Sequence, residues 1–292
     1  MHPLLLHNGE IRPATDRMLS PGQVGLLNGW GVFSTLRVIN GVLFAYPRHW
    51  ARMERDARLL NVPMPPSASD LEAQLYRLVE ANAAYEATLR VAIVRNTGGM
   101  FDAPNLDRDY DVVAFTKDLK DWGSGARLAL APATRDSAHE FRGTKMLSWS
   151  FNLVLLERAN RRGFDEVVML NERGEVSECT SANLFAVFGS EVVTPPLDSG
   201  CLPGVTRAIL LEEIRVPGLT ISERTLTPAD LERADEVFMT SSTRDVLPVT
   251  SIAGLALKAG PKPVQAKLLS AFRDYLTTYA AAHARPIEEA RA

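Results

Sequence analysis

A polar segment, Lys117–Gly125, divides the chain into two stretches that each carry their own strands and helices. It contains two glycines, which is typical of a connection rather than of a regular element. The full chain has 292 residues, which is long for a single hydrophobic core. The sequence therefore predicts two domains, residues 1–120 and 121–292.

Short strands alternate with helices in the first stretch. Asn8-Gly9 and Asn40-Gly41 are tight-turn pairs, and the second predicts a hairpin from Val32–Ile39 into Val42–Tyr46. We expect helices after Pro47 and over Ser69–Ala83, and buried strands at Leu89–Val94 and Val112–Thr116.

The second stretch also mixes both kinds of element. Its patterns predict strands at Arg127–Ala131, Glu166–Leu170, Val176–Ser181, Asn183–Phe188 and Val237–Thr240, and helices over Phe151–Arg162, from Val205 and over Val264–Ala282. This mixture favours an α+β fold over a regular βαβ winding.

Composition excludes several classes of protein. The formal net charge of −3 gives no basic footprint for nucleic acid. No apolar run approaches the ~20 residues of a membrane span, and the start, MHPLLLHNGE, lacks the basic region of a signal peptide. Two cysteines, Cys179 and Cys201, suit a reducing compartment, so we expect a cytoplasmic protein without nucleic-acid or membrane partners. The five histidines have no metal-ligand spacing, so no metal site is expected.

Lysine is scarce, and one lysine has a distinctive setting. Lys145 is one of six and lies in FRGTKMLSW, among apolar neighbours. An ammonium in such surroundings loses hydration and becomes a nucleophilic amine, as a Schiff-base lysine requires. The alternative is an ordinary lysine in a surface loop.

A carboxylate also stands where a strand is expected. Glu178 lies within GEVSECTSANLFAVF, residues 174–188, between two apolar runs. A buried carboxylate is costly unless it has a partner, and a protonated pyridine nitrogen is one such partner. The alternative is a carboxylate that points out from a sheet edge.

Two segments have the features of an anion site. In GCLPGVTR, residues 200–207, Gly204 allows close approach to the backbone, and Val205 and Thr206 begin a helix, whose free N–H groups attract anions. In MTSSTRD, residues 239–245, Ser241 and Ser242 follow a strand and could also hold a phosphate. The alternative is a capped helix without a ligand.

Together these residues resemble the class IV aminotransferases, the fold-type IV pyridoxal-phosphate enzymes. The family's long motif begins with a glutamate and continues through asparagine, an apolar residue and an aromatic. This chain fills it with Glu178, Asn183, Leu184 and Phe185, then Thr194, and ends in the pattern from Leu202 to Arg207.

The resemblance implies a small α+β N-terminal domain and a larger barrel-like C-terminal domain with pyridoxal 5′-phosphate between them. Lys145 would form the Schiff base, and Glu178 would bind the pyridine nitrogen. The residues expected at the phosphate are Arg52, Val205, Thr206, Ser241 and Ser242. A homodimer is also implied.

Substrate recognition is expected in the N-terminal domain. Arg37 and Arg90 could each bind a carboxylate bidentately, although either could be an ordinary salt-bridge partner. Thr35 lies two residues before Arg37 in FSTLR, residues 33–37, and completes the expected substrate-binding set.

We therefore expect an aminotransferase that moves an amino group between a branched-chain or similar apolar amino acid and a 2-oxo acid. TPPLDSGCLPGVTR, residues 194–207, is similar to branched-chain aminotransferases. GVFSTLRVING, residues 31–41, is more similar to aminodeoxychorismate lyases, so a lyase that releases 4-aminobenzoate and pyruvate is the alternative. A second alternative is a non-catalytic protein that binds the cofactor.

Overall fold

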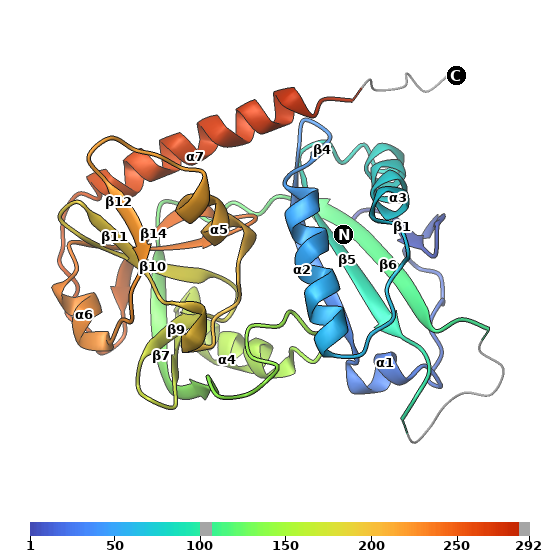
Figure 1. The fold of residues 1–292 in the computed structure, drawn as a ribbon, viewed down its shortest axis with the longest axis horizontal. Coiled ribbons are helices and arrows are strands. Elements are labelled where there is room, and N and C mark those ends of the chain that lie inside the picture. The colour runs from blue at the N-terminus through green and yellow to red at the C-terminus, as the bar shows by residue number, and fades with distance from the viewer. Residues whose placement is uncertain (100–106, 286–292) are drawn as a thin grey trace. The chain divides into compact units, whose positions relative to one another are not determined.

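The computed structural model describes residues 1–99 and 107–285. The chain divides into two compact units (Figure 1). The first contains Met1–Lys120 and the chain from Tyr275 onward, and the second contains Asp121–Asp274. These units differ from the predicted ranges at the end of the chain, because the last helix continues into the first unit. There Tyr275 and Tyr279 pack edge-on against Phe44, with ring centroids 6.2 and 5.1 Å away.

The first unit is built on a six-stranded antiparallel sheet with the order β2-β1-β6-β5-β3-β4. Asn8-Gly9 and Asn40-Gly41 have positive φ angles throughout, as tight hairpin turns require. The strands are β1 Leu4–His7, β2 Glu10–Pro13, β3 Gly31–Ile39, β4 Val42–Leu43, β5 Ala87–Arg95 and β6 Tyr110–Asp118.

Three helices accompany this sheet: α1 Val24–Asn28, α2 Tyr46–Leu59 and α3 Ala68–Ala81. The Ser67 hydroxyl caps α3 by accepting from the backbone N–H of Asp70 at 3.1 Å, a contact worth about 1 kcal/mol. Alternate residues of β3, among them Leu36, join α2 and α3 in one apolar core. The other face of β3 is thereby left for side chains with another role.

The predicted strand Val42–Tyr46 is wrong in its second half. β4 ends at Leu43, and Ala45 takes a left-handed conformation with φ +53° from which α2 begins at Tyr46. Pro47 lies in the first turn of the helix, where its missing N–H costs nothing and its fixed φ suits the helix.

The second unit contains an eight-stranded mixed sheet with the order β12-β11-β10-β13-β14-β7-β8-β9. β9 stands last in this order, yet only three residues connect it to β10, which stands third. The sheet must therefore curl, as Figure 1 shows. The strands are β7 Ala126–Arg135, β8 Glu166–Asn171, β9 Val176–Cys179, β10 Asn183–Phe188, β11 Glu191–Thr194, β12 Thr220–Glu223, β13 Glu236–Ser241 and β14 Asp245–Ile252.

The remaining helices are α4 Ser150–Arg161, α5 Val205–Glu212, α6 Pro228–Arg233 and α7 Pro263–Ala282, with a short 3-10 turn, η1, at Leu197–Ser199. Two sheets with associated helices confirm the predicted α+β class. Across residues 1–99 and 107–285, helices that combine the length and the apolar character of a membrane span do not occur.

Candidate active site

Glu178 lies on β9 and is 4% exposed. Its Oε1 accepts a hydrogen bond from Arg135 Nη2 at 2.6 Å, and its Oε2 accepts one from the backbone N–H of Leu202 at 3.2 Å. A guanidinium offsets much of the cost of burying a carboxylate, so the partner within the chain is Arg135. A carboxylate has about four lone-pair sites, and Glu178 can therefore still accept from a further donor.

Lys145 follows a turn that only glycine suits. Gly143 has φ +65°, and a Cβ there would lie 2.7 Å from the carbonyl oxygen of Cys201. The loop before Lys145 therefore approaches the same Cys201–Pro203 segment whose Leu202 N–H bonds Glu178. The Lys145 side chain is partly exposed, with Nζ 6.0 Å from the centroid of the Trp149 ring. The fold thus brings the loop that carries Lys145 and the carboxylate of Glu178 to one segment.

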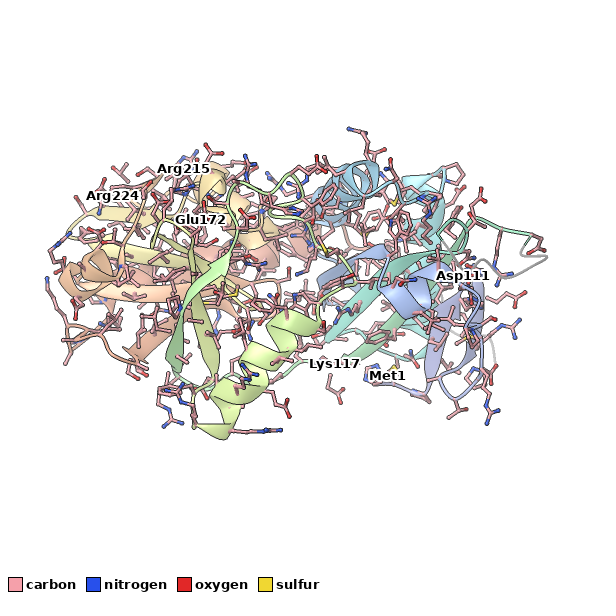
Figure 2. The ribbon with its side chains drawn as sticks, turned by 90° about the horizontal axis from the view of Figure 1, so that it is seen from below. Met1, Asp111, Lys117, Glu172, Arg215 and Arg224 are labelled. Carbon is pink, nitrogen blue, oxygen red and sulfur yellow. The ribbon has the colours of Figure 1, made fainter. Side chains whose placement is uncertain are left out.

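A clamp at the other end of this loop fixes its path. Glu172 accepts from the backbone N–H of Ser137 at 2.8 Å and from the Ser137 hydroxyl at 2.6 Å. These bonds lower the pKa of Glu172 to about 2. Figure 2 marks Glu172 in the second unit, directly after β8. The segment from Ser137 to Gly143 is therefore held at both ends.

The same Cys201–Pro203 segment leads into α5. Gly204 is the N-cap of α5, and a Cβ on it would overlap the side-chain oxygen of Asn183. Asn183 Nδ2 donates to the carbonyl of Leu202 at 2.9 Å. The start of α5 is therefore packed directly against the start of β10.

Thr206, in the first turn of α5, is 2% exposed, and its Oγ1 has no hydrogen-bond partner among the residues that the structure describes. A buried hydroxyl without a partner costs about 1–3 kcal/mol, so it is a site for an acceptor from a ligand. It lies among the open N–H groups of a helix start, which attract anions.

Ser241 and Ser242 come to the same region through β13. Asn183 of β10 pairs with Thr240 of β13, so the start of β10 lies beside the end of β13, where Ser241 is the last residue of the strand and Ser242 follows it. The helix α5 also packs against β13. The structure therefore brings together the anion-binding candidates of both predicted segments.

Arg52 belongs to the first unit. It lies on α2, is buried, and donates from Nη2 to the Ser34 hydroxyl at 2.8 Å. Ser34 also bonds Nδ1 of His49 at 2.7 Å. The guanidinium of Arg52 therefore has a fixed position against β3.

The three substrate candidates share the face of the first sheet that points away from the apolar core. Arg90 of β5 stands directly opposite Thr35 of β3, and Arg37 is two residues further along β3. The Arg90 guanidinium lies 3.8 Å from the centroid of the Phe33 ring, and burial lowers the pKa of Arg90. An arginine remains a cation under such conditions, so this face can bind a carboxylate.

Metal chemistry has no candidate ligands in the described part of the chain: residues 1–99 and 107–285 contain no group of three or more His, Cys, Asp or Glu side chains that could hold an ion.

The curled second sheet, the buried carboxylate and the lysine loop define the architecture of a fold-type IV enzyme. The structure superposes on that of the branched-chain amino acid aminotransferase from Escherichia coli, with a TM-score of 0.84 and 25% identity over 94% of this chain and 94% of that one. The family described as Amino-transferase class IV matches residues 31–252. The chain belongs to this family.

Curated relatives differ in their reactions. The D-alanine aminotransferase of Bacillus licheniformis is 27% identical over 272 residues, which cover 92% of this chain and 96% of the relative. The aminodeoxychorismate lyase of Bacillus subtilis (strain 168) is 28% identical over 253 residues, which cover 84% and 85%. This chain is similar to both transaminating and lyase members of the family.

Arg135 is not among the site residues that the sequence predicts. It lies at the end of β7, and the residues next to it in the sequence form no motif. Only the pairing of β7 with β8 and of β8 with β9 brings it to Glu178.

Proposed function

We propose that this protein is a pyridoxal-phosphate-dependent aminotransferase that moves an amino group between an apolar amino acid, of the branched-chain type, and a 2-oxo acid. The observation that carries this proposal is that the loop of Lys145, through Gly143, and the carboxylate of Glu178 both approach the Cys201–Gly204 segment, which then begins α5. An amine, a carboxylate and an anion-binding helix start are the three groups that this cofactor needs.

The residues of the second unit fit pyridoxal phosphate. The buried Thr206 hydroxyl, for which the described part of the chain supplies no hydrogen-bond partner, and the first N–H groups of α5 suit the phosphate. The carboxylate of Glu178 suits a protonated pyridine nitrogen. When bound, the cofactor supplies an electron sink for the carbanion that forms at the substrate α-carbon.

Lys145 has two tasks in this proposal. Its amine would hold the cofactor, and the same amine would move the proton at the substrate α-carbon. Positioned proton transfer of this kind is typically worth ~10²–10⁴ in rate. Glu178 would keep the pyridine nitrogen protonated, while the hydrogen bond from Arg135 holds Glu178 in place.

The remaining candidates bind and orient. Val205, Thr206, Ser241 and Ser242 would bind the phosphate, together with Arg52, whose guanidinium is already fixed by Ser34. Arg37, Arg90 and Thr35 would bind the substrate carboxylate on the face of β3 and β5 that points away from the apolar core. The apolar ring of Phe33 under Arg90 favours an apolar substrate beside that carboxylate.

The lyase reaction is the second candidate, and the similarity to the Bacillus subtilis aminodeoxychorismate lyase supports it. Aminodeoxychorismate would be split into 4-aminobenzoate and pyruvate, with the same Lys145 and Glu178 in the same roles.

We also propose a homodimer. Phe151, Leu153 and Val154 in the first turns of α4 are 53%, 51% and 43% exposed, and grouped apolar side chains on a surface mark an interaction site. Phe151→Glu should shift the protein from dimer to monomer in sedimentation velocity, and an unchanged sedimentation coefficient would exclude this helix as the interface.

Borohydride reduction tests the assignment of Lys145. The reduced holoenzyme should carry the cofactor on the peptide that contains Lys145, and Lys145→Ala should lose the visible absorption band, whereas Lys267→Ala, at an exposed position of α7, should keep it. Label on another lysine would refute the assignment.

A panel of amino acids, assayed for 2-oxo acid beside a test for 4-aminobenzoate release, separates the two reactions, and cofactor binding without either product would indicate a non-catalytic protein.

A further inference from the structure

We infer that Arg244 is a positioning residue: with Glu166 and Trp122 it fixes the turn that follows β13 in the shape that binds the cofactor phosphate. The inference rests on the proposed function, because it takes Ser242, in the middle of this turn, to contact that phosphate. Arg244 itself would not touch the cofactor.

Trp122 holds the turn from one side. The Arg244 guanidinium lies 3.8 Å from the centroid of the Trp122 ring, a distance at which a cation is attracted to the ring face. The indole Nε1 of Trp122 also donates to the backbone carbonyl of Thr243 at 3.0 Å. One aromatic side chain thus contacts both the side chain and the backbone of the turn.

Glu166 holds Arg244 from within the unit. Glu166 is fully buried at the start of β8, and its Oε2 lies 3.2 Å from Arg244 Nη2. Its carboxylate also accepts from the hydroxyls of Thr180 and Ser181. These three side-chain donors belong to two turns, residues 180–182 and 241–245, so one carboxylate connects both turns.

Arg244 also joins these two turns. Its Nη1 donates to the backbone carbonyl of Ser181 at 3.2 Å and to the Ser241 hydroxyl at 3.4 Å. The first turn follows Glu178 by two residues and precedes Asn183, which contacts the start of α5. The Arg244 guanidinium therefore connects the turn of residues 241–245, which is proposed to bind the phosphate, to the turn that follows the strand of Glu178.

Stability alone does not account for this pair. Arg244 is 9% exposed, and burial lowers its pKa while the nearby Glu166 carboxylate opposes that effect. A buried ion pair of this kind is often no more stabilising than apolar residues of similar volume. What apolar residues could not supply is the set of directed bonds to Ser181 and Ser241, which fix backbone geometry.

Two ligands that differ only in the phosphate can test whether the turn of residues 241–245 has a role in phosphate binding. Pyridoxal 5′-phosphate should lose affinity when the turn is loosened, whereas pyridoxal should not, because it makes no contact there. A general loss of structure would weaken both ligands alike. The comparison therefore distinguishes positioning of the turn from a merely structural role.

The experiment measures dissociation constants of both ligands for cofactor-depleted full-length protein. The double variant Glu166→Gln/Arg244→Met leaves no unpaired buried charge and should bind pyridoxal 5′-phosphate at least about tenfold more weakly, equivalent to about 1.4 kcal/mol, with pyridoxal affinity unchanged. Arg273→Met is the matched control, since Arg273 is an exposed arginine 3.9 Å from Asp245 at the edge of the same turn, and it should bind both ligands as the parent protein does.

Trp122→Phe provides a second variant that keeps an aromatic ring over the guanidinium and removes only the bond to Thr243. It should show a smaller loss that is again selective for the phosphorylated ligand. Equal losses for both ligands, or unchanged affinity in both variants, would overturn the inference. If the parent protein bound pyridoxal 5′-phosphate no better than pyridoxal, the phosphate site itself would be refuted, and this inference with it.

Discussion

Arg135 at the end of β7 donates to Glu178 on β9 at a distance of 2.6 Å, across the intervening strand β8. The other carboxylate oxygen accepts from the backbone N–H of Leu202. The carboxylate is therefore held at both oxygens before any ligand arrives. A preorganised group of this kind loses little orientational freedom when it binds.

Removal of Arg135 should destabilise the cofactor-free protein. Arg135→Met leaves Glu178 buried without its cation, at a cost of about 2–3 kcal/mol, whereas Arg135→Met/Glu178→Gln should recover most of that loss. Urea unfolding of the two single variants and the double variant measures the coupling free energy. Strictly additive effects would show that the two side chains do not interact.

Glu178→Gln should keep the cofactor and lose catalysis. Without a negative partner the pKa of the pyridine nitrogen falls, so the ring no longer withdraws electrons from the carbanion. The phosphate contacts and Lys145 are untouched. We expect the turnover rate to fall by a factor on the order of 10² or more with little change in KM, because the lost interaction matters mainly in the transition state.

Single-turnover loss of the cofactor absorption band with a good amino-acid substrate checks this. A rate near that of the parent protein would show that Glu178 serves only as the ion-pair partner of Arg135 and has no role in catalysis.

The sequence predicts those site residues whose near neighbours in the chain form a recognisable pattern. Lys145 stands among apolar neighbours, Glu178 lies within an apolar strand pattern, and Thr206 begins a helix after Gly204. Each of these signals depends on near neighbours in the chain, and each of the three residues lies in the expected element or loop of the structure. Their roles toward the cofactor stay predictions.

The features that the sequence does not predict depend on how strands distant in the chain pair with one another. Arg135 reaches Glu178 only through the strand order β7-β8-β9, and no pattern in the sequence encodes that order. The strand β14 is also missing from the sequence prediction, because Pro248 lies within it and a proline argues against a strand. Short strands such as β12, of four residues, are too brief to show an alternation.

Acid should reveal the clamp between Glu172 and Ser137. The hydrogen bonds from Ser137 lower the pKa of Glu172 from 4.5 to about 2. A carboxyl whose pKa is lower in the folded state contributes stability above its unfolded pKa and loses it as the pH falls through the folded value. The contribution is therefore complete above about pH 5 and declines toward pH 2.

Glu172→Gln should consequently have a lower Tm than the parent protein at neutral pH, and the difference should shrink as the pH is lowered from about 5. Glu157→Gln, on the exposed surface of α4, is the control. A difference in Tm that stays constant down to the acid transition would show that the charge of Glu172 does not support the clamp.

Thr206→Val should separate folding from cofactor binding, because it is expected to change them in opposite directions. The Thr206 hydroxyl is buried, and residues 1–99 and 107–285 contain no hydrogen-bond partner for it, so its replacement by a methyl group removes a desolvation cost. We expect the cofactor-free variant to be more stable by about 1 kcal/mol.

The same hydroxyl is the proposed donor to the cofactor phosphate, so the affinity for pyridoxal 5′-phosphate should fall about tenfold, the loss of one hydrogen bond to a charged group. Urea unfolding of the cofactor-free protein and titration with the cofactor measure the two effects separately. A variant that loses stability in the absence of cofactor would indicate that the hydroxyl has a partner within the protein, and one that keeps full affinity would remove Thr206 from the phosphate site.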